Sequence, residues 1–233
     1  DNTVWDYIDE ESAIRITKEE LEDNVDSIKY IPEKVLKKCP RECIEFLTQN
    51  ITEDAFEYIP EEIVRQCPEQ CLEAIKNRIP LIYIPEEIQL KYSKTCLNRL
   101  LKQKKDFYIM RDFEQLSDKI KLENPDICVY VIKKISENQD ERDYYNENLK
   151  SKILEIVESI PRELWKDIEF YKKITELFPE MYIGEYERFM SNIPEEMLND
   201  KNFIEEIYKK DRRVLFCTND DIREEILNKD KGI

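Results

Sequence analysis

The sequence predicts an all-α protein of helical hairpins stacked as an α-solenoid, either as one array or in two segments. Three observations support this fold class: a short Ile-Pro-Glu phrase recurs along the chain, Leu, Glu and Lys are abundant, and only two glycines occur in 233 residues. Leu, Glu and Lys favour helix, whereas the hairpins of a sheet need glycine at their turns. Repeats this short are single supersecondary units that bury their apolar faces by stacking on one another.

The recurring phrase divides the chain into two sets of repeats. Its copies span Tyr30–Val35, Tyr58–Ile63, Tyr83–Ile88, Ile160–Leu164 and Ile193–Met197. The first three copies are 28 and 25 residues apart, and the last two are 33 residues apart. We therefore expect N-terminal repeats over residues 1–135 with a period of about 25–28 residues and C-terminal repeats over 151–233 with a period of about 33. Residues 136–150 are polar and are expected to form a linker or an exposed helix.

Each unit is expected to contain two helices. Pro60 is predicted at the first helical position, where a missing N–H costs nothing, and Glu61 and Glu62 follow it, where acids favour the helix dipole. Pro68 then opens a second helix that carries Cys71 on its inward face.

Further segments are assigned by alignment with this unit. Ile16–Leu21 resembles a partial first unit with Thr17 as its helix cap. Tyr108–Phe113 is a degenerate first helix of the fourth unit. The second half is predicted to have longer second helices over Asp167–Leu177 and Asp200–Lys210, and a last short helix capped by Thr218 or Asn219.

Cysteine recurs at one position of the second helix. The residues at this position are Cys43, Cys71, Cys96 and Cys128. A small apolar side chain suits a tight helix crossing, which favours core packing. The alternative rests on the twin C-x-x-x-C pattern of Cys39, Cys43, Cys67 and Cys71, which resembles that of small chaperones of the mitochondrial intermembrane space. Such pairs allow disulfides between neighbouring helices or a four-thiolate zinc site.

The composition removes the common catalytic arrangements. The chain has no histidine, which excludes Ser–His and Cys–His nucleophile pairs and HExxH zinc sites, and it has no glycine-rich phosphate loop. Paired carboxylates such as Glu195 and Glu196 follow prolines at helix starts, where the helix dipole explains them. We therefore expect no enzyme activity, no catalytic residues and no cofactor.

The net charge points to the class of partner. A formal charge of −16 disfavours nucleic acid and anionic membranes and favours a basic protein partner. No apolar run reaches the roughly 18 residues of a membrane span. Seven cysteines in an acidic, lysine-rich chain suggest a reducing, cytoplasmic compartment unless they pair.

One cluster lies outside the repeat, so packing within the repeat does not account for it. It comprises Asp140, Glu141, Asp143, Tyr144 and Tyr145. Tyrosine is enriched at interaction hot spots, which makes these residues candidates for partner binding, with a solvated linker as the alternative.

The units resemble a family of short helical repeats of unknown function, found in secreted effectors of intracellular bacteria and in proteins of amoebal giant viruses. The matching stretches are Cys67–Ile88 and Ile193–Ile204; the chain departs from the family where cysteine or isoleucine replaces the alanine of the second helix. The resemblance implies an effector-like interaction protein, in the host cytosol if secreted, and transfers no site residues. The alternative function is an acidic inhibitor or nucleic-acid mimic that blocks a basic nucleic-acid-binding protein such as a defence nuclease.

Overall fold

The fold is helical wherever the structure describes it. A computed structural model describes residues 7–23, 25–50, 54–77, 79–137, 147–177 and 183–230, and all secondary structure in these ranges is α-helix or 3-10 helix, with no strand. The predicted all-α class is therefore confirmed. The chain divides into two compact units, Asp1–Ser117 and Asp118–Ile233.

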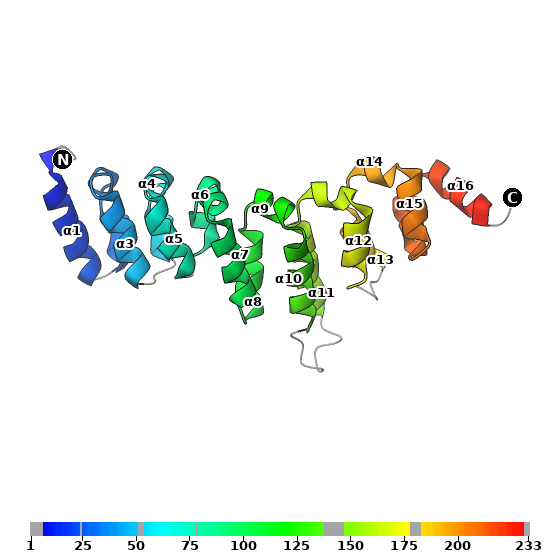
Figure 1. Ribbon diagram of the computed structural model, residues 1–233, viewed down its shortest axis with the longest axis horizontal. Helices are drawn as coiled ribbons and strands as arrows, with labels where there is room; N and C mark the ends of the chain where they lie inside the picture. The colour runs from blue at the N-terminus through cyan, green and yellow to red at the C-terminus, as the bar shows by residue number, and fades with distance from the viewer. Residues whose placement is uncertain are drawn as a thin grey trace. The chain divides into compact units, whose positions relative to one another are not determined.

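The first unit is a succession of short first helices and longer second helices. Its elements are α1 (Glu10–Asp23), the 3-10 helix η2 (Val25–Tyr30), α2 (Glu33–Leu36), α3 (Pro40–Asn50), η3 (Asp54–Tyr58), α4 (Glu61–Gln66), α5 (Pro68–Lys76), η4 (Leu81–Tyr83), α6 (Glu86–Lys91), α7 (Ser93–Lys102) and α8 (Asp106–Glu114). Helix α1 packs on α3, α3 on α5 and α5 on α7, so these helices follow one another side by side (Figure 1).

The second unit alternates helices in the same way, but α-helices take the place of the 3-10 helices ahead of its Ile-Pro phrases. The prediction of longer second helices is wrong, since those that follow Pro161 and Pro194 have eight residues each, against nine to eleven in the first unit. Its elements are α9 (Asp118–Glu123), α10 (Asp126–Glu137), α11 (Glu147–Glu158), η6 (Arg162–Lys166), α12 (Ile168–Thr175), α13 (Ile183–Met190), α14 (Glu195–Leu198), α15 (Lys201–Tyr208), η7 (Arg212–Cys217) and α16 (Asp220–Asp230). Helix α10 packs on α11 and α12, and α11 packs on α13. Asp167 and Asp200 cap α12 and α15 by accepting backbone N–H groups.

The division between the units differs from the one in the sequence analysis. The sequence places the change at 136–150, where similarity between repeats ends, whereas the compact units meet between Ser117 and Asp118. Helix α10 keeps the repeat's cysteine, Cys128, yet it packs on α11 and α12 and therefore belongs to the second unit.

The recurrent prolines lie one residue earlier in their helices than predicted. Pro60 is the N-cap of α4, with a ψ of 134°, and Glu61 is the first helical residue. The carbonyl of Pro60 accepts the N–H of Ile63 at 2.8 Å. The extended proline therefore provides the first hydrogen bond of the helix without being a helical residue itself. Pro32, Pro85 and Pro194 have the same geometry. Pro68, in contrast, lies inside the first turn of α5 as predicted.

The predicted cap at Thr17 is wrong. Thr17 lies in the middle of α1, where it is 1 % exposed, and its hydroxyl oxygen is 3.3 Å from the sulfur of Cys39. A buried hydroxyl near a polar partner does not interrupt the helix, so α1 runs straight through the position.

The core of each unit lies between its successive helices, and the isoleucine of every recurrent Ile-Pro phrase is buried in it. No described helix is both long enough and apolar enough to cross a membrane.

Candidate interaction surface

The five residues proposed from the sequence as partner-binding cannot be placed. Asp140, Glu141, Asp143, Tyr144 and Tyr145 lie outside the described residues. The candidate surface is therefore built from residues whose positions are described.

A row of tyrosines occupies one repeated position of the first unit. Tyr30, Tyr58 and Tyr83 are the last residues of η2, η3 and η4, and each precedes the Ile-Pro dipeptide of its repeat. Tyr30 is 76 % exposed and Tyr58 is 44 % exposed, while Tyr83 is partly exposed. These three residues, with Ile82, which is 67 % exposed, are called the tyrosine row below.

Local backbone geometry directs these tyrosines away from the core. In each repeat the isoleucine after the tyrosine donates its N–H three residues back, as from Ile59 to the carbonyl of Phe56 at 3.1 Å. This tight turn buries Ile59 and Phe56 and leaves Tyr58 on the outside. Exposure therefore follows from the repeat itself, and each stacked unit presents its tyrosine at the same point of the fold.

Neighbouring members of the row lie on elements that touch. The 3-10 helices η2 and η3, which end in Tyr30 and Tyr58, pack on each other. The ammonium of Lys29 lies over the Tyr30 ring, 5.1 Å from its centroid, which is within the range of a cation–π contact. The rings of this row are thus accessible to a cation.

The second unit shows that the Ile-Pro phrase does not require tyrosine. Ser159 and Asn192 occupy the equivalent position there, ahead of the buried Ile160 and Ile193. The Ser159 hydroxyl donates to the carbonyl of Ile156 at 2.8 Å, and the Asn192 amide donates to nearby backbone carbonyls. A short polar side chain therefore satisfies the turn, so packing does not explain the tyrosines of the first unit.

Ion pairs between consecutive repeats lie on the first helices. Lys37 contacts Glu62 of the next repeat at 3.0 Å, and Arg65 contacts Glu87 at 3.3 Å. In the second unit, Lys166 contacts Glu196 at 2.7 Å. Each cation lies five residues after its proline, and each carboxylate lies two residues after the proline of the following repeat.

This ladder of ion pairs changes the interpretation of the paired carboxylates. Hydrogen bonds to Glu33 and Glu62 raise the pKa of Lys37, and a hydrogen bond from Lys166 lowers the pKa of Glu196. Cations of the same chain neutralise several of the recurrent acids. Because each cation recurs at the same distance from its proline, the sequence contains the information needed to predict this ladder, although our sequence analysis did not use it.

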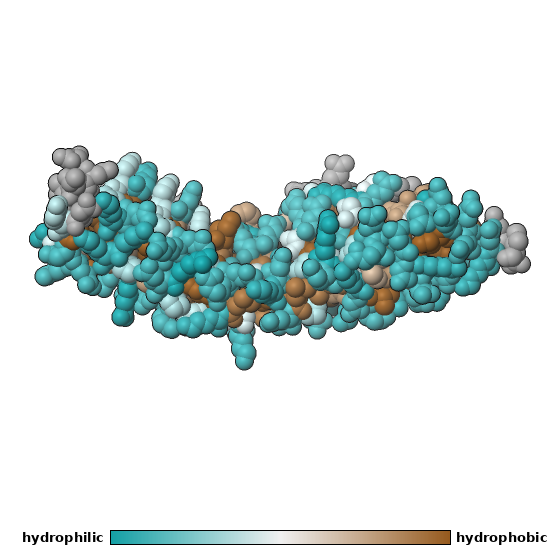
Figure 2. All heavy atoms as spheres, turned by 90° about the horizontal axis from the view of Figure 1, so that it is seen from above, coloured by the Kyte–Doolittle hydropathy of each residue, from teal (hydrophilic) through white to brown (hydrophobic). Residues whose placement is uncertain are grey.

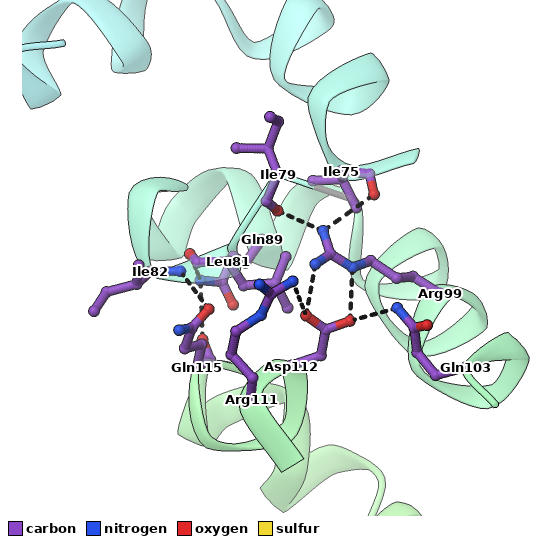
Figure 3. Close-up of polar contacts among 10 residues, drawn as sticks. All are labelled: Ile75, Ile79, Leu81, Ile82, Gln89, Arg99, Gln103, Arg111, Asp112 and Gln115. Atoms are coloured by element: carbon purple, nitrogen blue, oxygen red, sulfur yellow. Dashed lines mark hydrogen bonds and ion pairs between the residues drawn. The ribbon is translucent and has the colours of Figure 1, made fainter. Parts of the chain in front are cut away.

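A buried polar cluster occupies the end of the first unit (Figure 3). The Arg99 guanidinium donates to both oxygens of Asp112, at 2.8 and 2.5 Å, and to the carbonyls of Ile75 and Ile79. The Gln103 amide donates to the same carboxylate at 3.0 Å. Arg99 and Asp112 are 8 % and 0 % exposed, so this pair is removed from water.

Gln89 makes the second half of this cluster. Its amide nitrogen donates to the carbonyls of Leu81 and Ile84, each at 3.0 Å, and its oxygen accepts the N–H of Ser117 at 2.9 Å. These bonds tie η4 and α6 to the end of α8. Because the side chains of this cluster bond to backbone groups, the cluster fixes the neighbouring helices in place and presents no reactive group.

Sequence comparison between repeats contains the signal for this cluster. Gln89 stands where the preceding repeat has Val64, and Arg99 stands where it has Ala74. Two polar residues at apolar positions of one repeat indicate a buried network, although Asp112, the partner of Arg99, lies on another helix and breaks no repeat pattern.

The recurrent cysteines lie in the core, as the packing interpretation predicts. Cys43, Cys71, Cys96 and Cys128 are each 0 % exposed, and all seven cysteines of the chain are free thiols. Burial raises the pKa of Cys71 to about 12 and that of Cys96 to about 11. In the ranges that the structure describes, no group of three or more His, Cys, Asp or Glu side chains is arranged to hold a metal ion.

Comparisons with protein-family models, with curated proteins and with solved structures found no match to this chain.

Proposed function

We propose that this chain is a non-enzymatic interaction module, an α-solenoid of helical hairpins that holds a protein partner against the tyrosine row. The observation that carries the proposal is the exposure of Tyr30 and Tyr58 at a repeated position that the second unit fills with serine and asparagine. Tyrosine offers a large contact area at low cost in conformational entropy and is enriched at binding hot spots.

The packing of successive second helices supports the solenoid. Helices α1, α3, α5 and α7 each contact the next helix of the row. In such an array each repeat touches only its neighbours, so a side chain at one repeated position recurs along a continuous surface. A partner that crosses several repeats then meets several rings, which strengthens binding without any single strong contact.

The expected partner is basic. The chain has a net charge of −16, and the rings of the row attract cations, as the position of Lys29 over Tyr30 illustrates. The ion-pair ladder favours an interaction module over a nucleic-acid mimic, because a mimic needs carboxylates that are free of internal cations. A role as an effector-like protein in a host cytosol remains part of this proposal and rests on the family resemblance of the repeats.

The test captures partners on the wild-type chain and on two variants. Tyr30→Ala/Tyr58→Ala removes two rings of the row, and Tyr7→Ala, with a side chain that is 89 % exposed, is the matched control outside it. We expect a basic protein that is retained by the wild type and by Tyr7→Ala, survives a high-salt wash and is lost from the double variant. Retention by the double variant would reject the row as the binding surface.

The salt wash separates the two functions. Release of the partner at high salt, together with competition by RNA or DNA, would favour the nucleic-acid mimic, because screening weakens exposed charge contacts far more than packed rings.

A further inference from the structure

The connection between α7 and α8 differs in charge from the rest of this acidic chain. With the last residues of α7 and the first of α8 it presents Leu101, Lys102, Lys104, Lys105 and Phe107, which are called the basic tip below. All three lysines are exposed, Phe107 is 69 % exposed and Leu101 is 44 % exposed. Elsewhere, the face seen in Figure 2 is mainly hydrophilic with small separate hydrophobic areas.

The lysines of the basic tip are not used inside the protein. Lys37, Arg65 and Lys166 form salt bridges, but none of the side chains of Lys102, Lys104 and Lys105 forms a hydrogen bond or ion pair with any residue that the structure describes. Their charge therefore faces solvent without an internal salt bridge, next to a single half-buried carboxylate, that of Asp106.

Helix stability does not explain two of these lysines. Lys102 lies in the last turn of α7, where the helix dipole favours a cation. Lys105 is the N-cap of α8 and makes no side-chain capping hydrogen bond, and Lys104 precedes it. The dipole disfavours cations at this end of a helix, and serine or aspartate is the usual cap. Lys104 and Lys105 thus lower the stability of α8, and helix formation does not account for lysine at these two positions.

The buried polar cluster holds the basic tip in place. Gln103, between the exposed lysines, is 7 % exposed and donates to the Asp112 carboxylate, which Arg99 fixes from α7 (Figure 3). The carbonyl of Lys105 accepts the N–H groups of Tyr108 and Ile109, each at 3.1 Å. The lysines and Phe107 are therefore presented on an ordered turn, which reduces the entropy lost on binding.

We propose that the basic tip binds an acidic segment of a protein partner, with an apolar side chain of that segment on Phe107 and Leu101. Three cations without internal salt bridges, against the one carboxylate of Asp106, surround two exposed apolar side chains and complement such a segment in both charge and polarity. At physiological ionic strength, charges beyond about 8 Å are screened, so a short peptide meets the tip and not the −16 charge of the chain. An extended anionic membrane or nucleic acid faces much more of the acidic surface and is repelled.

The experiment measures the fluorescence anisotropy of a labelled peptide of glutamates interspersed with leucines, titrated with the full chain. Lys104→Glu/Lys105→Glu should weaken binding by about tenfold or more, since each rim charge becomes repulsive. Lys18→Glu/Lys94→Glu makes the same change of net charge at two other exposed lysines and should stay within about twofold of the wild type. Lys104→Arg/Lys105→Arg should keep the affinity, and Phe107→Ser should reduce it.

Three results would overturn the proposal. The first is the absence of saturable peptide binding by a wild-type chain that is folded by circular dichroism. The second is an equal loss in the Lys18/Lys94 control. The third is binding to phosphatidylserine vesicles, lost in the Lys104/Lys105 variant, without peptide binding, which would assign the tip to membranes. Because Tyr30→Ala/Tyr58→Ala leaves the tip intact, its peptide affinity should not change, so the two proposals fail independently.

Discussion

The two units use the same Ile-Pro phrase but fill their cores differently. The first unit packs cysteine and aliphatic side chains between its second helices: Cys43, Ile44, Leu47, Cys71, Ile75, Cys96 and Leu100. The second unit has an aliphatic core around α10 and α11 but packs aromatic rings from η6 to α15: Trp165, Phe170, Tyr171, Tyr186, Phe189 and Phe203. The aromatic core accompanies the longer repeat period and the α-helices α11 and α13, which stand ahead of Ile-Pro where the first unit has 3-10 helices.

At the surface position before Ile-Pro, the aromatic residues are in the first unit and not in the second, the reverse of the difference between the cores. The first unit exposes tyrosine there, and the second has serine or asparagine bonded to its own backbone. The repeat therefore tolerates exchange among apolar residues inside, since each core only has to fill its own space. Outside, the units differ in that exposed aromatic area appears on the first unit, where the turn does not need it for packing.

The largest expected effect is a loss in the free energy of unfolding that differs between the two cores. Trp165 is 0 % exposed and makes edge contacts with Phe170 and Phe189, each at 5.4 Å between ring centroids. Trp165→Ala should lower the free energy of unfolding by about 3–5 kcal/mol, because it leaves a cavity among rigid rings. Cys71→Ala in the first unit removes one heavy atom and should cost about 1 kcal/mol. Urea denaturation followed by circular dichroism measures both.

A conservative variant sharpens this comparison. The indole N–H of Trp165 is buried without a hydrogen-bond partner among the described residues. Trp165→Phe removes that donor together with part of the ring, so it should cost much less than Trp165→Ala. Equal costs for Trp165→Ala and Cys71→Ala would contradict the view that the second unit depends on its aromatic core.

A second effect compares a buried ion pair of the first unit with an exposed one of the second. Asp112→Ala leaves the Arg99 guanidinium buried without its carboxylate and should cost about 3–5 kcal/mol. Glu158→Ala removes the partner of Arg188, at 2.6 Å on the surface, and should cost about 0.2–1 kcal/mol. Both values come from the same denaturation assay.

The control for this pair is the double replacement Arg99→Met/Asp112→Leu. It removes Arg99 together with its carboxylate, so only Arg111, whose guanidinium lies 3.7 Å from Asp112, loses a counterion. It should therefore be less destabilising than Asp112→Ala, which leaves both cations without that carboxylate. If the double variant is as unstable as the single one, the cluster contributes through the bonds of Arg99 to the carbonyls of Ile75 and Ile79 rather than through the ion pair.

The repeat explains which parts of this structure the sequence could predict. Period, proline and apolar spacing are local properties, so the helices, the buried isoleucines and the capping role of Asn219, which accepts the N–H of Ile222, followed from them. Thr17 was misassigned because a hydroxyl that caps one helix can be buried in the middle of another. The pairing of Arg99 with Asp112 depends on two different helices meeting, which no local pattern encodes. The unpaired lysines of the basic tip became visible only once the partners of the other lysines were known.

A smaller effect than those of the Trp165 cavity and the broken Arg99–Asp112 pair concerns the thiols, such as Cys71, which is buried in the first unit, and Cys217, which is partly exposed in the second. Burial raises the pKa of Cys71 to about 12, whereas an unfolded thiol titrates near 8.5. Between these values the folded state binds more protons, so its stability falls as pH rises above about 8.5, by about 2 kcal/mol per such thiol at pH 10.

The measurement is the difference between urea denaturation at pH 7 and at pH 10. Cys71→Ala should reduce that difference, while Cys217→Ala should reduce it less because its thiol is already near water. Alkylation of the native chain at pH 8 gives an independent reading: Cys217 should react first, and the buried thiols only when their helices open. Rapid alkylation of Cys71 in the folded chain would show that the first unit opens readily, and its core could then not be the tightly packed counterpart of the aromatic one.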